Sequence, residues 1–227
     1  MINKYAQFIK DLRAERGFTQ SFMAEKLSIS RPSYIGIERG SREITLEEAE
    51  KLKDLFGISI EEFTSATLPK YEKYKQMILA YLKSSVSADD KVPKTKLAKL
   101  LYLADFAWYY QNLKSMSGMQ YLRRAHGPVP DPYFRALAEL EEEGKISVDH
   151  KGDAFLVSLS GSSSKQKLDL LGDKEIELIK KISAKWKNKN TRDIVDFTHA
   201  QLPYKICAPD EAIPYELIIQ QDPDYVY

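Results

Sequence analysis

The chain has 227 residues, of which 43% are hydrophobic and 30% are charged, and its formal net charge at pH 7 is +1. This composition is typical of a soluble globular protein with one large or two small domains, and its short, charge-interrupted apolar runs argue against a membrane span. The charged N-terminal residues argue against a signal peptide, and the single cysteine, Cys207, excludes an internal disulfide, so a cytoplasmic protein is expected.

The first helix is expected over Asn3–Arg16, where apolar residues recur at helical spacing. Two short helices joined by a tight turn are expected within Thr19–Gly40. Thr19 and Ser30 are side chains that cap helix N-termini, and Gly40 is a residue that commonly ends a helix. Such a pair of helices is typical of a DNA-binding helix-turn-helix, whose second helix enters the major groove.

The N-terminal end of that second helix provides most of the candidate DNA contacts. Tyr34 and Ile37 are expected to face inward, which leaves Arg31, Ser33, Ile35 and Gly36 on the outward face. The arginines that follow the helix are candidates for phosphate contact. The full set of candidate DNA-binding residues is Gln20, Ser30, Arg31, Ser33, Tyr34, Arg39 and Arg42.

Charge is unevenly distributed along the first part of the chain. Residues 1–42 carry eight basic and four acidic side chains, a net +4, whereas residues 43–68 carry two basic and seven acidic ones, a net −5. Only the first of these parts can face phosphate favourably. Binding by a single copy is therefore expected to be modest, and a homodimer is expected on DNA. Capping boxes that begin at Thr45 and Ser59 predict a fourth and a fifth helix.

The motif T-Q-x-x-x-A-E-K-L-x-I-S-R-P-x-Y-I-x-I-E-R-G at Thr19–Gly40 resembles the lambda-Cro/XRE helix-turn-helix family. The resemblance implies a five-helix domain, double-stranded operator DNA as its partner, and a structural ion pair between Arg13 and Glu38. The alternative is a helical bundle that binds only protein. That alternative is disfavoured, because such a bundle needs no outward polar row at a capped helix N-terminus.

A short linker over Thr64–Lys70 divides the chain into a domain of residues 1–68 and a second domain of residues 69–227. The second domain begins with a helix over Tyr71–Ser84. The most apolar helix of the chain follows over Pro93–Leu113. A helix that is apolar over most of its circumference is either core, which is the default, or partner surface.

The rest of the second domain mixes helices with a small β element. The prolines of Arg123–Tyr133 are expected to forbid regular structure there. The fold class expected for the whole chain is mainly α, with a five-helix lambda-repressor-like domain followed by an α+β helical domain. The further elements expected are a helix over Tyr133–Glu143, a β-hairpin of Lys145–Asp149 and Phe155–Leu159, helices over Asp173–Lys189 and from the cap Thr191 to Ala200, and an irregular tail.

Three pieces of the second domain, taken in their order and spacing, resemble the Panacea, or SocA-like, antitoxin-associated domain. They are KLAKLLYLADFAWYY at Lys96–Tyr110, GPVP at Gly127–Pro130 and THAQLPY at Thr198–Tyr204. The resemblance implies an antitoxin of a type II toxin–antitoxin pair, which neutralises a cognate protein toxin by direct binding and represses its own operon. The alternatives are a ligand-sensing or phage-type transcriptional repressor without a toxin, and a protease adaptor.

A toxin interface requires aromatic or arginine anchors at its centre. Asp105 is the one acid inside the apolar helix, and two interpretations stay open. It is a buried carboxylate paired with Arg123 or Arg124, or it faces solvent. The full set of candidate partner-binding residues is Tyr102, Asp105, Trp108, Tyr109, Arg123, Arg124 and His126.

The sequence shows no pattern of catalytic chemistry. None of the histidines His126, His150 and His199 belongs to an H-E-x-x-H pair, and there is no glycine-rich phosphate loop. Cys207 and His199 lack a third group that would orient a nucleophile–base pair. No catalytic residue, metal ligand or cofactor is therefore expected, and the chain is not expected to be an enzyme.

Overall fold

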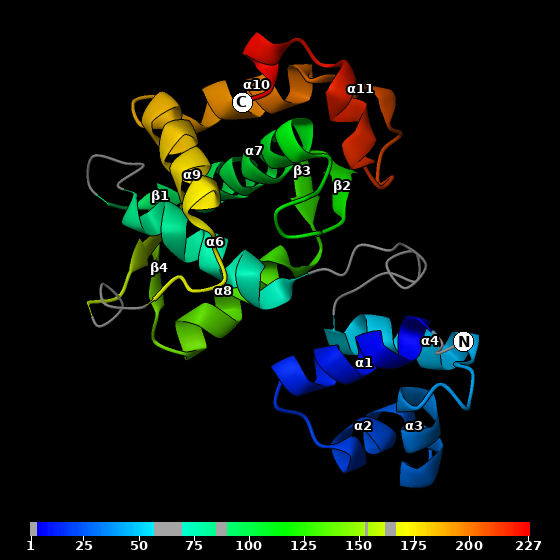
Figure 1. The fold of residues 1–227 in the computed structure, drawn as a ribbon. Helices are drawn as coiled ribbons and strands as arrows, with labels where there is room; N and C mark the ends of the chain where they lie inside the picture. The colour runs from blue at the N-terminus through cyan, green and yellow to red at the C-terminus, as the bar shows by residue number, and fades with distance from the viewer. Residues whose placement is uncertain (1–3, 57–69, 85–89, 153, 162–166) are drawn as a thin grey trace. The chain divides into compact units, whose positions relative to one another are not determined.

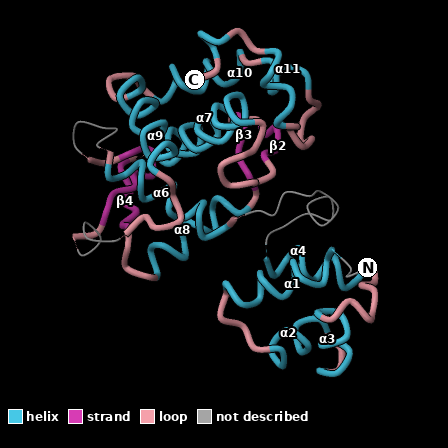
Figure 2. Tube along the Cα trace, in the orientation of Figure 1, coloured by secondary structure: helices cyan, strands magenta, loops and turns pink. Residues whose placement is uncertain are grey.

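The computed structural model describes residues 4–56, 70–84, 90–152, 154–161 and 167–227 (Figure 1). The structure divides into two compact units, Met1–Pro69 and Lys70–Tyr227. Both are mainly helical, and the second also contains two small antiparallel sheets (Figure 2). The predicted fold class is confirmed by this arrangement. None of the described helices has the length and apolar character needed to cross a membrane.

The first unit has four described helices, α1 (Lys4–Glu15), α2 (Gln20–Leu27), α3 (Arg31–Glu38) and α4 (Leu46–Phe56). Each contributes apolar side chains at helical spacing to one core. The fifth helix predicted from Ser59 lies outside the described residues. The core of this unit consists of Phe8, Ile9, Leu12, Met23, Ala24, Leu27, Tyr34, Ile37, Leu52 and Phe56.

Local side-chain capping fixes the start of both short helices. Thr19 Oγ1 accepts a hydrogen bond of 3.1 Å from the backbone N–H of Phe22, and Ser30 Oγ accepts one of 3.2 Å from Ser33. Between the helices Ser28 takes a left-handed conformation, with φ +59°, which makes the turn tight. These observations confirm the predicted caps, and the predicted capping box between Thr45 and Glu48 also forms.

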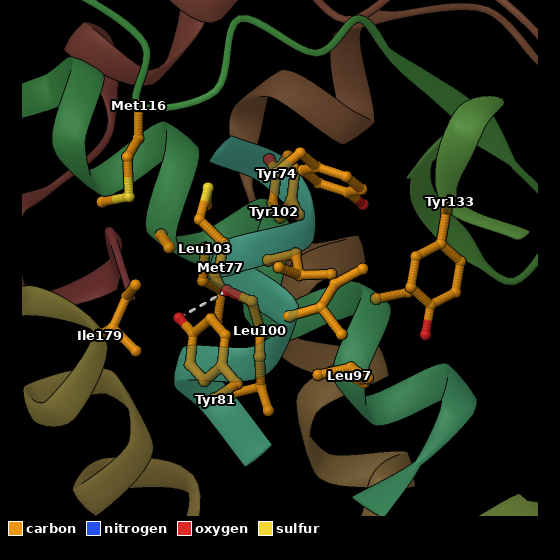
Figure 3. Packing of buried hydrophobic residues seen from close by; sticks show 14 of the residues in the cluster. Tyr74, Met77, Tyr81, Leu97, Leu100, Tyr102, Leu103, Met116, Tyr133 and Ile179 are labelled. Atoms are coloured by element: carbon orange, nitrogen blue, oxygen red, sulfur yellow. Dashed lines mark hydrogen bonds between the residues drawn. The ribbon is translucent and has the colours of Figure 1, made fainter. Parts of the chain in front are cut away.

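The second unit is built around α7 (Lys94–Asn112). Every residue of this helix from Lys96 to Ala107 is buried, which confirms the core assignment for that stretch. Figure 3 shows side chains of α7 packed against α6 (Tyr71–Lys83) and α9 (Asp173–Trp186). The hydroxyl of Tyr81 donates a hydrogen bond of 2.8 Å to the carbonyl of Leu100, which satisfies the buried hydroxyl.

A three-stranded antiparallel sheet in the order β1–β5–β4 lies beside these helices. Its strands β4 (Ile146–Lys151) and β5 (Ala154–Leu159) form the predicted hairpin. The third strand, β1 (Val92–Pro93), has only two residues, too few for any periodic pattern to reveal it. The hairpin follows α8 (Pro132–Glu142), whose start is one residue before the predicted one.

The expectation that prolines forbid regular structure after Arg123 is wrong. Strand β2 (Tyr121–Arg124) pairs antiparallel with β3 (Gly127–Pro130), and Arg123 lies opposite Pro128. In a two-stranded sheet each strand pairs with the other along one edge only. A proline, which has no backbone N–H to donate, is tolerated where its nitrogen lies on the unpaired edge. The segment around Glu211 lies along the other edge of β2, because the backbone N–H of Arg123 donates to the carbonyl of Glu211 at 2.9 Å.

The last part of the chain is more regular than predicted. The helix α10 (Thr191–Ala200) is capped by Asn190, whose side chain accepts a hydrogen bond of 2.9 Å from Asp193 N, and not by Thr191. The tail expected to be irregular forms α11 (Leu202–Ile206), and two 3₁₀ turns follow it, η2 (Tyr215–Gln220) and η3 (Pro223–Tyr225).

Candidate functional site

Four of the predicted DNA-binding residues gather at the N-terminus of α3. Arg31 is exposed and its Nη2 lies 3.4 Å from Oε1 of Gln20, at the start of α2. The hydroxyls of Ser30 and Ser33 are hydrogen-bonded to each other at 2.9 Å. These side chains offer hydrogen-bond donors and acceptors together at the end of the helix that a helix-turn-helix presents to the major groove.

A buried carboxylate holds this cluster in place. Glu38 accepts hydrogen bonds from Arg13 Nε at 2.5 Å and from Gln20 Nε2 at 2.8 Å. Burial alone would raise the pKa of Glu38, but the hydrogen bonds from Arg13 and Gln20 outweigh burial and hold it below the usual value. The predicted ion pair between Arg13 and Glu38 is therefore confirmed. Through Gln20 it also connects α1 and α3 to the side chain of Arg31.

The structure bears on the predicted roles of four further residues on or near α3. Tyr34 is fully buried, so its inclusion among the DNA-binding candidates is wrong. Arg42 donates two hydrogen bonds to Glu48, of 3.1 and 2.6 Å, and its contact with phosphate stays a prediction. Gly36 is half-buried, and a Cβ there would lie 3.3 Å from Cβ of Arg42. Arg39 is exposed, as a phosphate contact requires.

In the second unit, the three sequence pieces used for the antitoxin resemblance meet at one point. Lys99, on α7, is 2% exposed, and its Nζ donates to the carbonyl of Pro128 at 2.9 Å. Gly127 has φ +95°, and a Cβ there would lie 2.6 Å from Cε of Lys99 and 3.0 Å from Nε2 of His199. Only glycine allows α7, β3 and α10 to approach so closely.

At this meeting point burial disfavours the charged forms of two basic side chains, Lys99 and His199. Burial lowers the pKa of Lys99 to about 7. Burial also lowers the pKa of His199, and the neighbouring charges of Lys99, Arg123 and His126 lower it further. Among the residues that the structure describes, Nε2 of His199 is buried without a hydrogen-bond partner.

His199 also belongs to a stack of three side chains, which we call the Arg123–Tyr204–His199 stack. The rings of His199 and Tyr204 are parallel within 5°, with centroids 4.3 Å apart. The guanidinium of Arg123 lies over the ring of Tyr204 at 4.8 Å, and its Nε donates to the carbonyl of Tyr204 at 3.0 Å. The hydroxyl of Tyr204 in turn donates to the carbonyl of Arg124 at 3.0 Å.

Asp105 has a different environment from either of those left open by the sequence. It is 0% exposed and accepts hydrogen bonds from Ser117 N at 2.6 Å, from Ser117 Oγ and from Tyr121 OH at 2.9 Å. Burial raises its pKa to about 6 in spite of these bonds. The proposed pairing with Arg123 or Arg124 is wrong, and so is the solvent-facing alternative.

The predicted partner-binding residues therefore fall into two groups. Tyr102 and Asp105 are interior, and both are corrected from contact residues to core residues. Trp108, Tyr109 and Arg123 are partly exposed, with the hydroxyl of Tyr109 donating to Glu216 at 3.2 Å. The other accessible candidates are Arg124, which bridges Asp131 and Asp210, and the exposed His126.

Sequence reasoning missed Lys99, Tyr204 and the structural use of His199. The signal that could have found them was present, because all three lie inside the quoted sequence pieces and a lysine in an otherwise apolar helix calls for a partner. The described part of the chain holds no group of three or more His, Cys, Asp or Glu side chains that could bind a metal ion.

Comparison with known families and proteins places both halves of the chain. Residues 9–63 match a family described as helix-turn-helix, and residues 97–204 match one described as antitoxin SocA-like, Panacea domain. The chain is 33% identical over 61 residues, 27% of its length, to the cryptic phage CTXphi transcriptional repressor RstR of Vibrio cholerae. It spans about half of that relative, 55% of its length.

A second relative is covered more completely. Over 54 residues, 24% of the chain, identity is 39% to the uncharacterized HTH-type transcriptional regulator MJ0272 of Methanocaldococcus jannaschii, of which 82% is covered. None of the solved structures matches the chain significantly. The matched stretches of 61 and 54 residues cover 27% and 24% of the chain, so neither relative bears on the whole chain.

Proposed function

The chain belongs to the helix-turn-helix family of transcriptional regulators and carries an antitoxin SocA-like, Panacea domain, and from that premise we propose that it is an autoregulating antitoxin. The second unit binds and neutralises a protein toxin. The first unit represses, as a homodimer on operator DNA, the operon that encodes both proteins. Neither role requires a catalytic step or a cofactor, and both are performed in the cytoplasm.

The observation that best supports the DNA-binding part of the proposal is the ordered polar cluster at the N-terminus of α3. Its base-reading side chains are Arg31 and Ser33, positioned through Gln20 and the buried Glu38. A pre-ordered arginine loses less conformational entropy when it binds a guanine edge or a phosphate. Arg39 serves as a phosphate contact beside them.

We expect Arg31→Ala to weaken specific operator binding by about 1–3 kcal/mol, since a bidentate contact to a base edge contributes that much discrimination. The measurement is a titration of the operator and of unrelated DNA at several salt concentrations. The matched control is Lys10→Ala, which removes an exposed positive charge from α1 in the same unit. An equal loss on all sequences, with a shallower salt dependence, would instead assign Arg31 to phosphate.

The toxin-binding part of the proposal rests on the surface that remains accessible in the second unit. It includes the exposed His126 and four side chains of types that are enriched at the centres of protein interfaces, Trp108, Tyr109, Arg123 and Arg124. A stable inhibitory complex needs on the order of 1,600 Å² of total buried area, which a unit of this size can provide.

We expect expression of the neighbouring gene product alone to stop growth, and co-expression of this chain to restore it. The 69–227 fragment should restore growth as well, because neutralisation by direct binding needs no operator contact. Co-purification of the two proteins provides the biochemical readout. Rescue by the DNA-binding half alone would contradict this division of labour. Absence of any toxic neighbour would favour a phage-type repressor, in line with the resemblance of the first unit to RstR.

A further inference from the structure

Arg123 is held rigidly while part of its guanidinium remains available. Its Nε is committed to the carbonyl of Tyr204, and its plane is fixed against the Tyr204 ring. Its backbone is held on both sides, since Arg123 N donates to Glu211 O and Asp210 N donates to Arg123 O. Among the described residues, neither terminal nitrogen of Arg123 has a hydrogen-bond or ion-pair partner, and the side chain is only partly buried.

Arg124, the next residue in the same strand, has both terminal nitrogens of its guanidinium paired with carboxylates. Arg124 bonds Asp210 through Nη1 at 2.6 Å and Asp131 through Nη2 at 2.8 Å. Among the described residues, Arg123 has no such carboxylate partner. The Nζ of Lys99 also donates to a backbone carbonyl, that of Pro128, and not to a carboxylate. The pKa of His199 is lowered mainly by burial; the charges of Lys99, Arg123 and His126 lower it as well, and that of Asp196 acts in the opposite direction.

We propose that Arg123, held in the Arg123–Tyr204–His199 stack, receives a single carboxylate side chain, aspartate or glutamate, from the toxin. This inference rests on the proposed function and adds the chemistry by which the partner is recognised. A guanidinium whose plane is fixed in advance presents two parallel N–H donors to a carboxylate.

The surroundings favour a protein carboxylate over a nucleic-acid phosphate. Four acidic side chains, all exposed, lie on the elements that flank the stack. Such side chains repel a phosphate backbone, with one charge at every nucleotide, more than they repel a single carboxylate. These flanking side chains are Asp131, Asp196, Asp210 and Glu211.

The test uses the full chain and the protein encoded by the neighbouring gene, with the dissociation constant measured by calorimetry. We expect Arg123→Gln to weaken the complex about 10- to 100-fold, as loss of an interface arginine anchor does. Arg123→Lys should weaken it as well, because an ammonium cannot form the planar fork. The control Arg192→Gln, at a side chain that is 90% exposed on α10, should bind like wild type.

Glutamine keeps an N–H donor that can reach the carbonyl of Tyr204, so the variant preserves a local contact of the fold. Unfolding curves of wild type and variant establish whether it is folded. Salt should weaken the wild-type complex more steeply than the Arg123→Gln complex, a readout that a purely structural role of Arg123 would not change.

The possible outcomes distinguish failure of the carboxylate site from failure of the antitoxin function. Binding of Arg123→Gln within twofold of wild type would overturn the carboxylate site and leave the antitoxin function standing. Failure of the wild-type chain to bind the neighbouring product would overturn the antitoxin function, and the carboxylate site with it. Weaker operator binding by Arg123→Gln, with unchanged partner binding, would identify a phosphate site and would also overturn the inference.

Discussion

Replacing Asp105 with alanine is expected to lower the free energy of unfolding of the second unit by about 3–5 kcal/mol. The carboxylate accepts hydrogen bonds from the backbone and hydroxyl of Ser117 and from the hydroxyl of Tyr121. Alanine would leave a buried N–H and two buried hydroxyls without their acceptor, and would leave a cavity beside α7.

The measurement is simple because both tryptophans of the chain, Trp108 and Trp186, lie in the second unit. Urea unfolding followed by tryptophan fluorescence therefore reports on this unit and not on the DNA-binding one. The control is Asp196→Ala, which removes a mostly exposed carboxylate from α10. A loss below about 1 kcal/mol for Asp105→Ala, the contribution of one ordinary hydrogen bond, would contradict the structural role given to this residue.

The same residue makes the second unit sensitive to pH. Burial raises the folded-state pKa of Asp105 from 3.8 to about 6, so between these values the folded chain binds more protons than the unfolded chain. The contribution of Asp105 to stability therefore falls as pH rises from about 4 to about 6, and is constant above that range. Asp105→Asn should remove this part of the pH dependence, as unfolding curves at several pH values can show.

The second large effect is expected at Gly127. Its φ of +95° disfavours any side chain, and an added Cβ would lie 2.6 Å from Cε and 2.9 Å from Nζ of Lys99. To relieve the clash, Cε and Nζ of Lys99 would have to shift, which would disturb the bond from Nζ to the carbonyl of Pro128. We expect Gly127→Ala to destabilise the second unit by about 2–4 kcal/mol, from backbone strain and overpacking together.

The matched control for this prediction is Gly144→Ala. Gly144 also has a positive φ, +67°, but a Cβ there would meet nothing within 4 Å. The difference between the two variants therefore reports the clash with Lys99 and His199 together with the extra backbone cost of φ +95° over +67°. Equal losses of stability would mean that the close approach of α7, β3 and α10 at Gly127 contributes nothing.

Features set by near neighbours in the chain could be predicted from the sequence. The caps at Thr19 and Ser30 act over three residues, so residue type and spacing were sufficient. The first unit was predicted well for this reason, and the link between Arg13 and Glu38 came from the family resemblance. Tyr34 is the exception, because the candidate DNA contacts include it although its helical position places it in the core.

Features set by distant parts of the chain could not be predicted. Asp105 accepts a hydrogen bond from the backbone N–H of Ser117, in the segment that follows α7. The residue pattern of that segment does not predict which backbone N–H will bond to a distant carboxylate. Arg123 was a plausible partner by charge, but its position on β2 directs it to Tyr204, which is 81 residues away. The prolines misled for a related reason, since their tolerance depends on which edge of a strand is paired.

The central position of α7 also has a consequence for how the two units appear during translation. The described core of the DNA-binding unit is complete once the ribosome has added Phe56. The core around α7 also includes Ile179, Ile194, Ile218 and Val226, so it cannot close until almost the whole chain has been made. Because domains fold in the order of their synthesis, we expect a prematurely terminated chain to hold a folded first unit without a folded second unit. Under the function proposed above, such a chain would bind DNA without neutralising a toxin.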